Sequence, residues 1–81
     1  MKILLKVFPI ADINDSTQEF ELELDNGKLG EVLEWLKQTL GIDPHSGVLM
    51  ILCNGQSLDL LKEYDLSAND TLWAMPMLAG G

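Results

Sequence analysis

The sequence has no arginine: its five basic residues are all lysines, against 13 acidic residues, and its formal net charge is −8. A protein that binds nucleic acid gains much of its affinity from basic side chains that contact phosphates. Five scattered lysines cannot form such a patch, so we expect neither nucleic acid nor an anionic membrane as a partner. Partners with a basic docking face are favoured instead, because opposite charge speeds their encounter.

The sequence also has little cysteine and no long apolar run. Cys53 is its one cysteine, so an internal disulfide is excluded. The longest uncharged stretch, residues 44–58, is shorter than the ~20 apolar residues of a membrane helix. Near the N-terminus, Lys6 interrupts the apolar residues too early for a signal peptide. These features predict a cytoplasmic protein.

Its 81 residues are enough for one domain with a small core. The hydrophobic fraction of 47% and the charged fraction of 22% are typical of a compact chain rather than a disordered one.

Four segments show strand patterns. The first begins at residue 2 and ends before Pro9. The second alternates strictly, with Phe20, Leu22 and Leu24 on one face and Glu19, Glu21 and Glu23 on the solvated face. A polar segment joins these two as a hairpin with a long loop. A third strand turns at Asn54-Gly55, and the last strand has the sequence TLWAMPML.

One segment shows a helical pattern. Apolar residues recur along a single stripe, formed by Leu29, Val32, Leu33, Leu36 and Leu40. Asp25 or Asn26 is expected to cap the start of this helix, and Gly41 to end it. Trp35 lies beside the stripe, at the margin of the helix.

The order of elements predicts an α+β fold. A helix with one apolar stripe must bury it against one face of a sheet. The first and last strands are the most apolar, so we expect them at the centre of a mixed sheet and parallel to each other. This arrangement, with one helix packed across one face, is a β-grasp.

Several short motifs resemble the ubiquitin-like β-grasp superfamily, and most closely its sulfur-carrier branch: the small subunit of molybdopterin synthase and the sulfur carrier of the thiamine pathway. The matching pieces span nearly the whole chain and read LGEVLEWL, CNG, YDLSANDTLWAMP and LAGG. Two departures stand out. Ala68-Asn69-Asp70 replaces the usual Gly-Asp turn, and the C-terminal segment lacks the arginines of ubiquitin itself.

The resemblance implies a carrier protein and not an enzyme. In such families a partner enzyme uses ATP to adenylate the C-terminal carboxylate, which then becomes a thiocarboxylate; the carrier itself binds no cofactor. Gly81 would be the attachment point, residues 78–81 (Leu78, Ala79, Gly80 and Gly81) a flexible tail, and residues 1–77 the domain. Partners would be the adenylating enzyme and a larger synthase subunit. The resemblance fits both molybdenum cofactor and thiamine biosynthesis.

The physics of the chain end agrees with this role. Four extended residues reach ~13 Å, and two glycines present no Cβ to a narrow channel. The alternative, from another functional class, is a non-conjugated ubiquitin-like interaction module whose C-terminus is chemically idle.

Strand alternation also predicts an apolar docking face on the side of the sheet away from the helix, formed by Phe8, Met50, Leu52, Trp73 and Met75. The alternative is a register shifted by one, which would place these residues in the core. Cys53 is interpreted as a packed structural cysteine rather than a sulfur-handling thiol, because no cationic residue adjoins it in the sequence. His45 has no neighbouring ligand for a metal.

Overall fold

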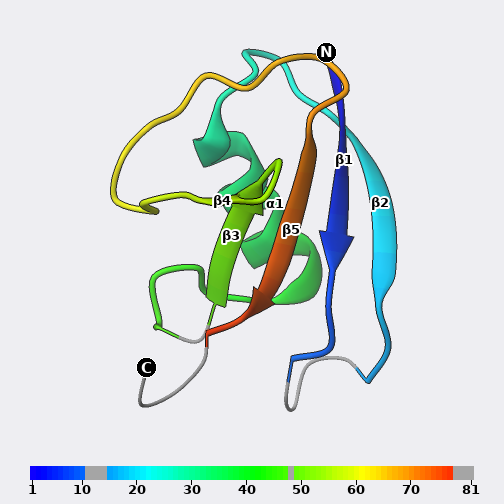
Figure 1. Ribbon diagram of the computed structural model, residues 1–81, viewed down its shortest axis with the longest axis vertical. Helices are drawn as coiled ribbons and strands as arrows, with labels where there is room; N and C mark the ends of the chain where they lie inside the picture. Colours follow the sequence, from blue (N-terminus) through cyan, green and yellow to red (C-terminus); the bar gives the residue numbers. More distant parts are fainter. Residues whose placement is uncertain (11–14, 48, 78–81) are drawn as a thin grey trace.

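The computed structural model describes residues 1–10, 15–47 and 49–77 and shows, within them, one mixed sheet and one helix (Figure 1). The strands are β1 (Lys2–Val7), β2 (Gln18–Glu23), β3 (Leu49–Cys53), β4 (Gln56–Ser57) and β5 (Thr71–Pro76), and the helix is α1 (Leu29–Leu40). The described ranges contain no helix long and apolar enough to cross a membrane.

The sheet has the strand order β2-β1-β5-β3-β4. As predicted, β1 and β2 form an antiparallel hairpin, and the first and last strands, β1 and β5, lie side by side and parallel near its centre. The pairs β3–β5 and β3–β4 are antiparallel. Helix α1 lies across one face of this sheet, behind it in the view of Figure 1. The predicted β-grasp is confirmed.

The core lies between α1 and the sheet. The predicted stripe of α1 is buried at Leu29, Val32, Leu33 and Leu36, whereas Leu40 is half-buried. The sheet contributes alternate residues of its strands, which are Ile3, Leu5, Val7, Leu49, Ile51, Leu72 and Ala74. Burying one such leucine or isoleucine fully stabilises the fold by about 2 kcal/mol. The same alternation turns the intervening residues of β1, β3 and β5 toward the opposite face.

The start of α1 differs from the prediction, because neither Asp25 nor Asn26 caps it. The side chain of Glu31, in the first turn, instead accepts backbone N–H groups from Asp25 at 2.7 Å, Asn26 at 3.0 Å and Lys28 at 3.0 Å. These bonds, above all the one from Lys28, hold the pKa of Glu31 below its ordinary value. The predicted end at Gly41 is confirmed, with a left-handed φ of 69°.

The predicted tight turn at Asn54-Gly55 joins β3 to β4. Both residues have positive φ angles, 53° and 86°, which asparagine and glycine tolerate better than other residues. Because β4 is only two residues long, it pairs only with Leu52 and Cys53, at the end of β3. The first residues of β3, beginning with Leu49, therefore have no partner in β4.

Candidate docking face and C-terminal segment

Four apolar side chains gather on the face of the sheet away from α1. Within β5, Trp73 and Met75 alternate with the buried Leu72 and Ala74. The antiparallel register places Leu52 of β3 beside Trp73, and Met50 beside Met75. Trp73 is 39% exposed, and the other three are half-buried. The predicted orientation is confirmed, and a register shifted by one is wrong.

Phe8 joins this group from the end of β1. Its ring meets Trp73 edge to face, with centroids 5.5 Å apart and an interplanar angle of 67°. Its backbone N–H donates to the Ala74 carbonyl at 2.8 Å, which continues the pairing of β1 with β5. Phe8, Met50, Leu52, Trp73 and Met75 are called the outer-face cluster below. All five residues predicted from the sequence therefore lie on one side of the sheet.

A cation adjoins the outer-face cluster. The Nζ atom of Lys6 lies 5.5 Å from the centroid of the Phe8 ring, within the range of a cation–π interaction. Lys6 is also the cross-strand partner of Trp73. Lys6 was not predicted as part of this face, although its position two residues before Phe8 in a strand places both on the same side of the sheet.

Acidic side chains line the edge of the sheet beside this face. On β2, Glu19, Glu21 and Glu23 are all exposed, as the alternating pattern predicts. Across the strand pair, Lys6 is opposite Glu19, and Lys2 is opposite Glu23 and lies 3.6 Å from the Glu21 carboxylate. The outer face thus has an apolar centre and a mostly acidic edge, which complements an apolar partner surface with basic surroundings.

The C-terminal segment begins on the strand that carries the outer-face cluster. Strand β5 ends at Pro76, which is paired with Leu49, and Met77 after it is 50% exposed. The predicted tail residues Leu78, Ala79, Gly80 and Gly81 lie outside the described residues. Trp73 and Met75, which a partner would bind on this face, therefore lie only a few positions before this segment in the sequence.

The environment of Cys53 disfavours its thiolate form. Burial, and then the negative charge of Asp70, raise the pKa of the thiol, whose Sγ atom lies 3.9 Å from the Asp70 carboxylate. A neutral thiol is a poor nucleophile and a poor metal ligand. This supports the interpretation of Cys53 as structural. Within residues 1–10, 15–47 and 49–77, no group of three or more His, Cys, Asp or Glu side chains is arranged to hold a metal ion.

No protein-family model matches the chain, and no curated protein matches it. Solved structures are similar to it. A chain from the complex of subunits 1 and 2 of the molybdopterin-converting factor of Helicobacter pylori has a TM-score of 0.70 and 23% identity. SAMP1 from Haloferax volcanii has a TM-score of 0.69 and 22% identity, and the ubiquitin of Caldiarchaeum subterraneum has 0.55 and 18%.

Each of these three comparisons covers 100% of this chain and 100% of the other. The similarity therefore extends over the whole fold and not over a shared fragment. Two of the three neighbours match the resemblance drawn from the sequence, since one is a molybdopterin-converting factor chain and one a ubiquitin. At these identities the comparisons establish architecture: this chain has the ubiquitin-like β-grasp fold.

Proposed function

We propose that this chain is a sulfur-carrier protein of ubiquitin-like fold, and that the carboxylate of Gly81 is the group that carries the sulfur. A partner enzyme adenylates this carboxylate and converts it to a thiocarboxylate, which supplies sulfur for the biosynthesis of molybdenum cofactor or thiamine. The chain acts as a substrate and carrier in the cytoplasm, and the partner binds the ATP.

One observation carries the proposal. Strand β5 places Trp73 and Met75 on the outer face and ends at Pro76, and in the sequence only Met77 separates it from residues 78–81. A partner that docks on the outer-face cluster is thereby brought next to the chain end. The four residues that follow Met77 extend by up to ~13 Å, a reach comparable with the depth of an enzyme active site.

The residues of the C-terminal segment suit the reaction. A carboxylate is unreactive toward nucleophiles until one of its oxygens becomes part of a better leaving group. In adenylation, an oxygen of the Gly81 carboxylate attacks the α-phosphorus of ATP and pyrophosphate leaves. Hydrosulfide or an equivalent sulfur donor then attacks the acyl carbon and displaces AMP, which leaves the thiocarboxylate. Gly80 and Gly81 add no side chain that would obstruct this approach.

The outer-face cluster would provide affinity for the partner. Aromatic residues and methionine are enriched at protein interfaces, and tryptophan is enriched among the residues that contribute most to binding. The neighbour from the molybdopterin-converting factor was solved in a complex of two subunits. By analogy, the same face of this chain would serve two partners in turn, first the adenylating enzyme and then a larger synthase subunit.

Exchange of labelled pyrophosphate into ATP tests the first step, because adenylation is reversible. The adenylating enzyme is first isolated from the source organism by its binding to this chain. The proposal predicts that this enzyme exchanges label only when the chain is present, and that removing Gly80 and Gly81 abolishes exchange. Equal exchange with the shortened chain would favour the alternative of an interaction module with an idle C-terminus.

A further inference from the structure

Part of the β3 edge is unpaired. Strand β4 covers only Leu52 and Cys53, and Leu58 after it donates its N–H to the Ile51 carbonyl at 2.9 Å. Backbone groups alternate in direction along a strand, so Leu49 directs its N–H and C=O to the same side as Ile51, away from β5. Its register partner on β5 is Pro76, and the two form a non-hydrogen-bonded pair. None of the described residues pairs with the Leu49 backbone on that outer side.

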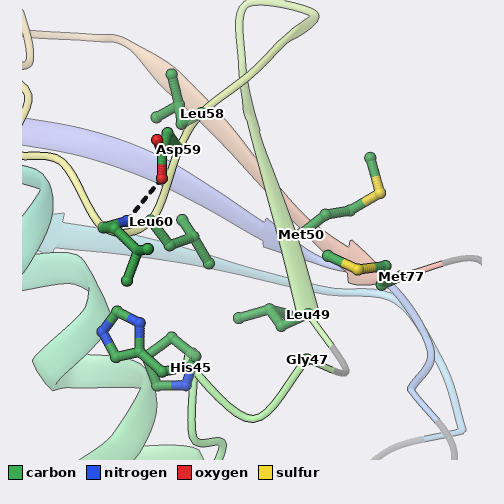
Figure 2. Close-up of a pocket in the computed structure, with 10 residues that line it drawn as sticks. His45, Gly47, Leu49, Met50, Leu58, Asp59, Leu60 and Met77 are labelled. Atoms are coloured by element: carbon green, nitrogen blue, oxygen red, sulfur yellow. Dashed lines mark hydrogen bonds between the residues drawn. The ribbon is translucent and has the colours of Figure 1, made fainter.

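An apolar pocket of about 370 Å³ lies against this edge (Figure 2). The loop after β4 borders it, together with the loop between α1 and β3 and the residue that follows β5. Figure 2 shows Met50 and Met77 together at one side of the pocket, with Leu49 directed toward the other. Its apolar lining consists mainly of Leu49, Met50, Leu58, Leu60, Leu61 and Met77.

The exposed leucine at this pocket is held in place. Leu61 is 87% exposed and borders the pocket, so it adds to a contiguous apolar surface. Its backbone N–H donates to Oδ1 of Asp59 at 2.9 Å. The N–H of Asp59 in turn donates to the Tyr64 hydroxyl at 3.0 Å. These bonds define the backbone conformation of the loop at Leu61.

The charges around the pocket are mostly acidic. Asp59 lines it, and Asp43 directly precedes the lining residue Pro44. One cation, Lys62, follows the lining residue Leu61 and is itself followed by Glu63. The described lining includes no lysine, and the whole chain carries a net charge of −8. Both a second copy of this chain and the carboxylate end of its own residues 78–81 would meet like charge here. A cationic segment would meet opposite charge.

We propose that the β3 edge and this pocket bind an extended peptide segment of a partner protein, flanked by lysine or arginine. The segment pairs its backbone with Leu49 as an added strand. One aliphatic side chain enters the pocket between Leu49 and Leu60, and the basic residues flank Asp43 and Asp59. This edge surface goes beyond the proposed function and does not depend on it, because it shares only Met50 with the outer-face cluster.

A synthetic peptide of this chemistry tests the proposal. The capped peptide Lys-Arg-Val-Leu-Val-Arg-Lys is titrated into the full-length chain labelled with ¹⁵N. The proposal predicts a dissociation constant of about 1 mM or tighter. It also predicts amide shifts centred on Leu49 and Leu58 to Leu61, with slower hydrogen exchange at the Leu49 amide. The amide signals of Trp73 and of Gln18 to Glu23 should not shift.

Methylated peptides test the strand pairing without altering the protein. Successive residues of the peptide direct their N–H groups to opposite sides. We therefore expect N-methylation at the central leucine and at the adjacent valine to change the affinity of the peptide by different amounts. Methylation of the residue whose N–H faces Leu49 should lower the affinity of the peptide about tenfold. Methylation of the other residue should change that affinity by less than about twofold.

Protein variants test the pocket and its charge. Asp59→Asn keeps an oxygen acceptor for the Leu61 N–H and removes one charge, so we expect binding to weaken about threefold at low salt. Glu19→Gln on β2, at the opposite edge of the sheet, removes the same charge and should have almost no effect. Leu61→Ser should weaken binding about fivefold and leave the fold unchanged, because the side chain is exposed.

Four results with the peptides would overturn the proposal. They are no binding of the peptide at about 5 mM, shifts centred on Trp73 instead of Leu49, equal effects of the two N-methylations, and equal binding of a peptide in which glutamate replaces every lysine and arginine. A concentration-dependent dimer of the free chain that buries Leu61 would also overturn it, in favour of a second copy as the occupant.

Discussion

Leu72 and Trp73 are adjacent in β5 but lie on opposite faces of the sheet: Leu72 is fully buried against α1, whereas Trp73 is 39% exposed beside Phe8. Leu72 therefore contributes to the stability of the domain, and Trp73 to its proposed binding role. Leu72→Ala and Trp73→Ala remove large apolar side chains one position apart, so each serves as a control for the other.

Trp73→Ala should abolish partner binding and only slightly destabilise the fold. The variant loses one edge-to-face contact and part of a half-exposed surface, about 1 kcal/mol. Leu72→Ala creates a cavity in the core and should cost about 3 kcal/mol. Thermal unfolding by circular dichroism, together with titration of the adenylating enzyme, measures both effects. A larger loss of stability in Trp73→Ala than in Leu72→Ala would contradict the assigned register.

Gly81→Val should block adenylation while the domain stays folded. A β-branched side chain beside the reacting carboxylate restricts the backbone and obstructs the approach of ATP, so we expect the rate of pyrophosphate exchange to fall about 100-fold. Gly81→Ala is the matched control and should show an intermediate loss. Exchange by Gly81→Val at the wild-type rate would show that the chain end does not have to pass through a narrow channel.

Glu31→Gln should lower the melting temperature near neutral pH and flatten its dependence on acid pH. The folded state depresses the pKa of Glu31 below its ordinary value of 4.5, so the carboxylate stabilises the fold above that pH. This contribution is lost as the pH falls through the lower, folded pKa. Melting curves of wild type and variant from about pH 7 to about pH 2 should therefore converge at the acid end.

The control for this measurement is Glu34→Gln, in the same helix. Glu34 is exposed and bonds to the Gln38 side chain rather than to the backbone at the helix start. We expect its melting curves to follow those of the wild type at each pH. If Glu34→Gln and Glu31→Gln changed stability alike, general charge repulsion rather than capping would account for the effect.

Cys53→Ala should leave sulfur loading unchanged. The raised pKa keeps the Cys53 thiol protonated at neutral pH, so it is a poor candidate for an intermediate sulfur carrier. The substitution should cost about 1 kcal/mol of stability. In the wild type, iodoacetamide should alkylate Cys53 several-fold more slowly than glutathione at about pH 8. Loss of thiocarboxylate formation in Cys53→Ala would give the thiol a chemical role.

Regular patterns in the sequence predicted much of the fold. The alternation of Phe20 and Leu22 with glutamates defined β2, and the stripe from Leu29 to Leu36 defined the buried side of α1. Asn54-Gly55 predicted the turn between β3 and β4 because few residues tolerate positive φ. These signals are local, and each acts within one element or turn.

Features that depend on the path of the loops were not predicted. Glu31 caps α1 because residues 25–28 fold back over the helix start, whereas the sequence favoured the aspartate and asparagine found there. The pocket beside β3 was missed for a similar reason. Leu58, Leu60 and Leu61 follow no strand or helix period, and only the short length of β4 exposes the edge that they border.

The arrangement of the outer-face cluster was predictable from the sequence only in part. Parity along β5 placed Trp73 and Met75 on one face, but their positions beside Leu52 and Met50 depend on the register of β3 with β5. The contact of Phe8 with Trp73 needs the parallel pairing of β1 with β5 as well. A single strand therefore predicts which way a side chain points, while pairing determines its neighbours.

The most direct test of the carrier role is the intact mass of the protein isolated from its native host. Replacement of oxygen by sulfur at the C-terminal carboxylate adds about 16 Da, and fragmentation of the intact chain assigns the added mass to a residue. We predict a fraction of molecules with this increase localised to Gly81. A Gly81 without added mass in cells that actively synthesise molybdenum cofactor and thiamine would contradict the account, also where a methionine carries the same increase through oxidation.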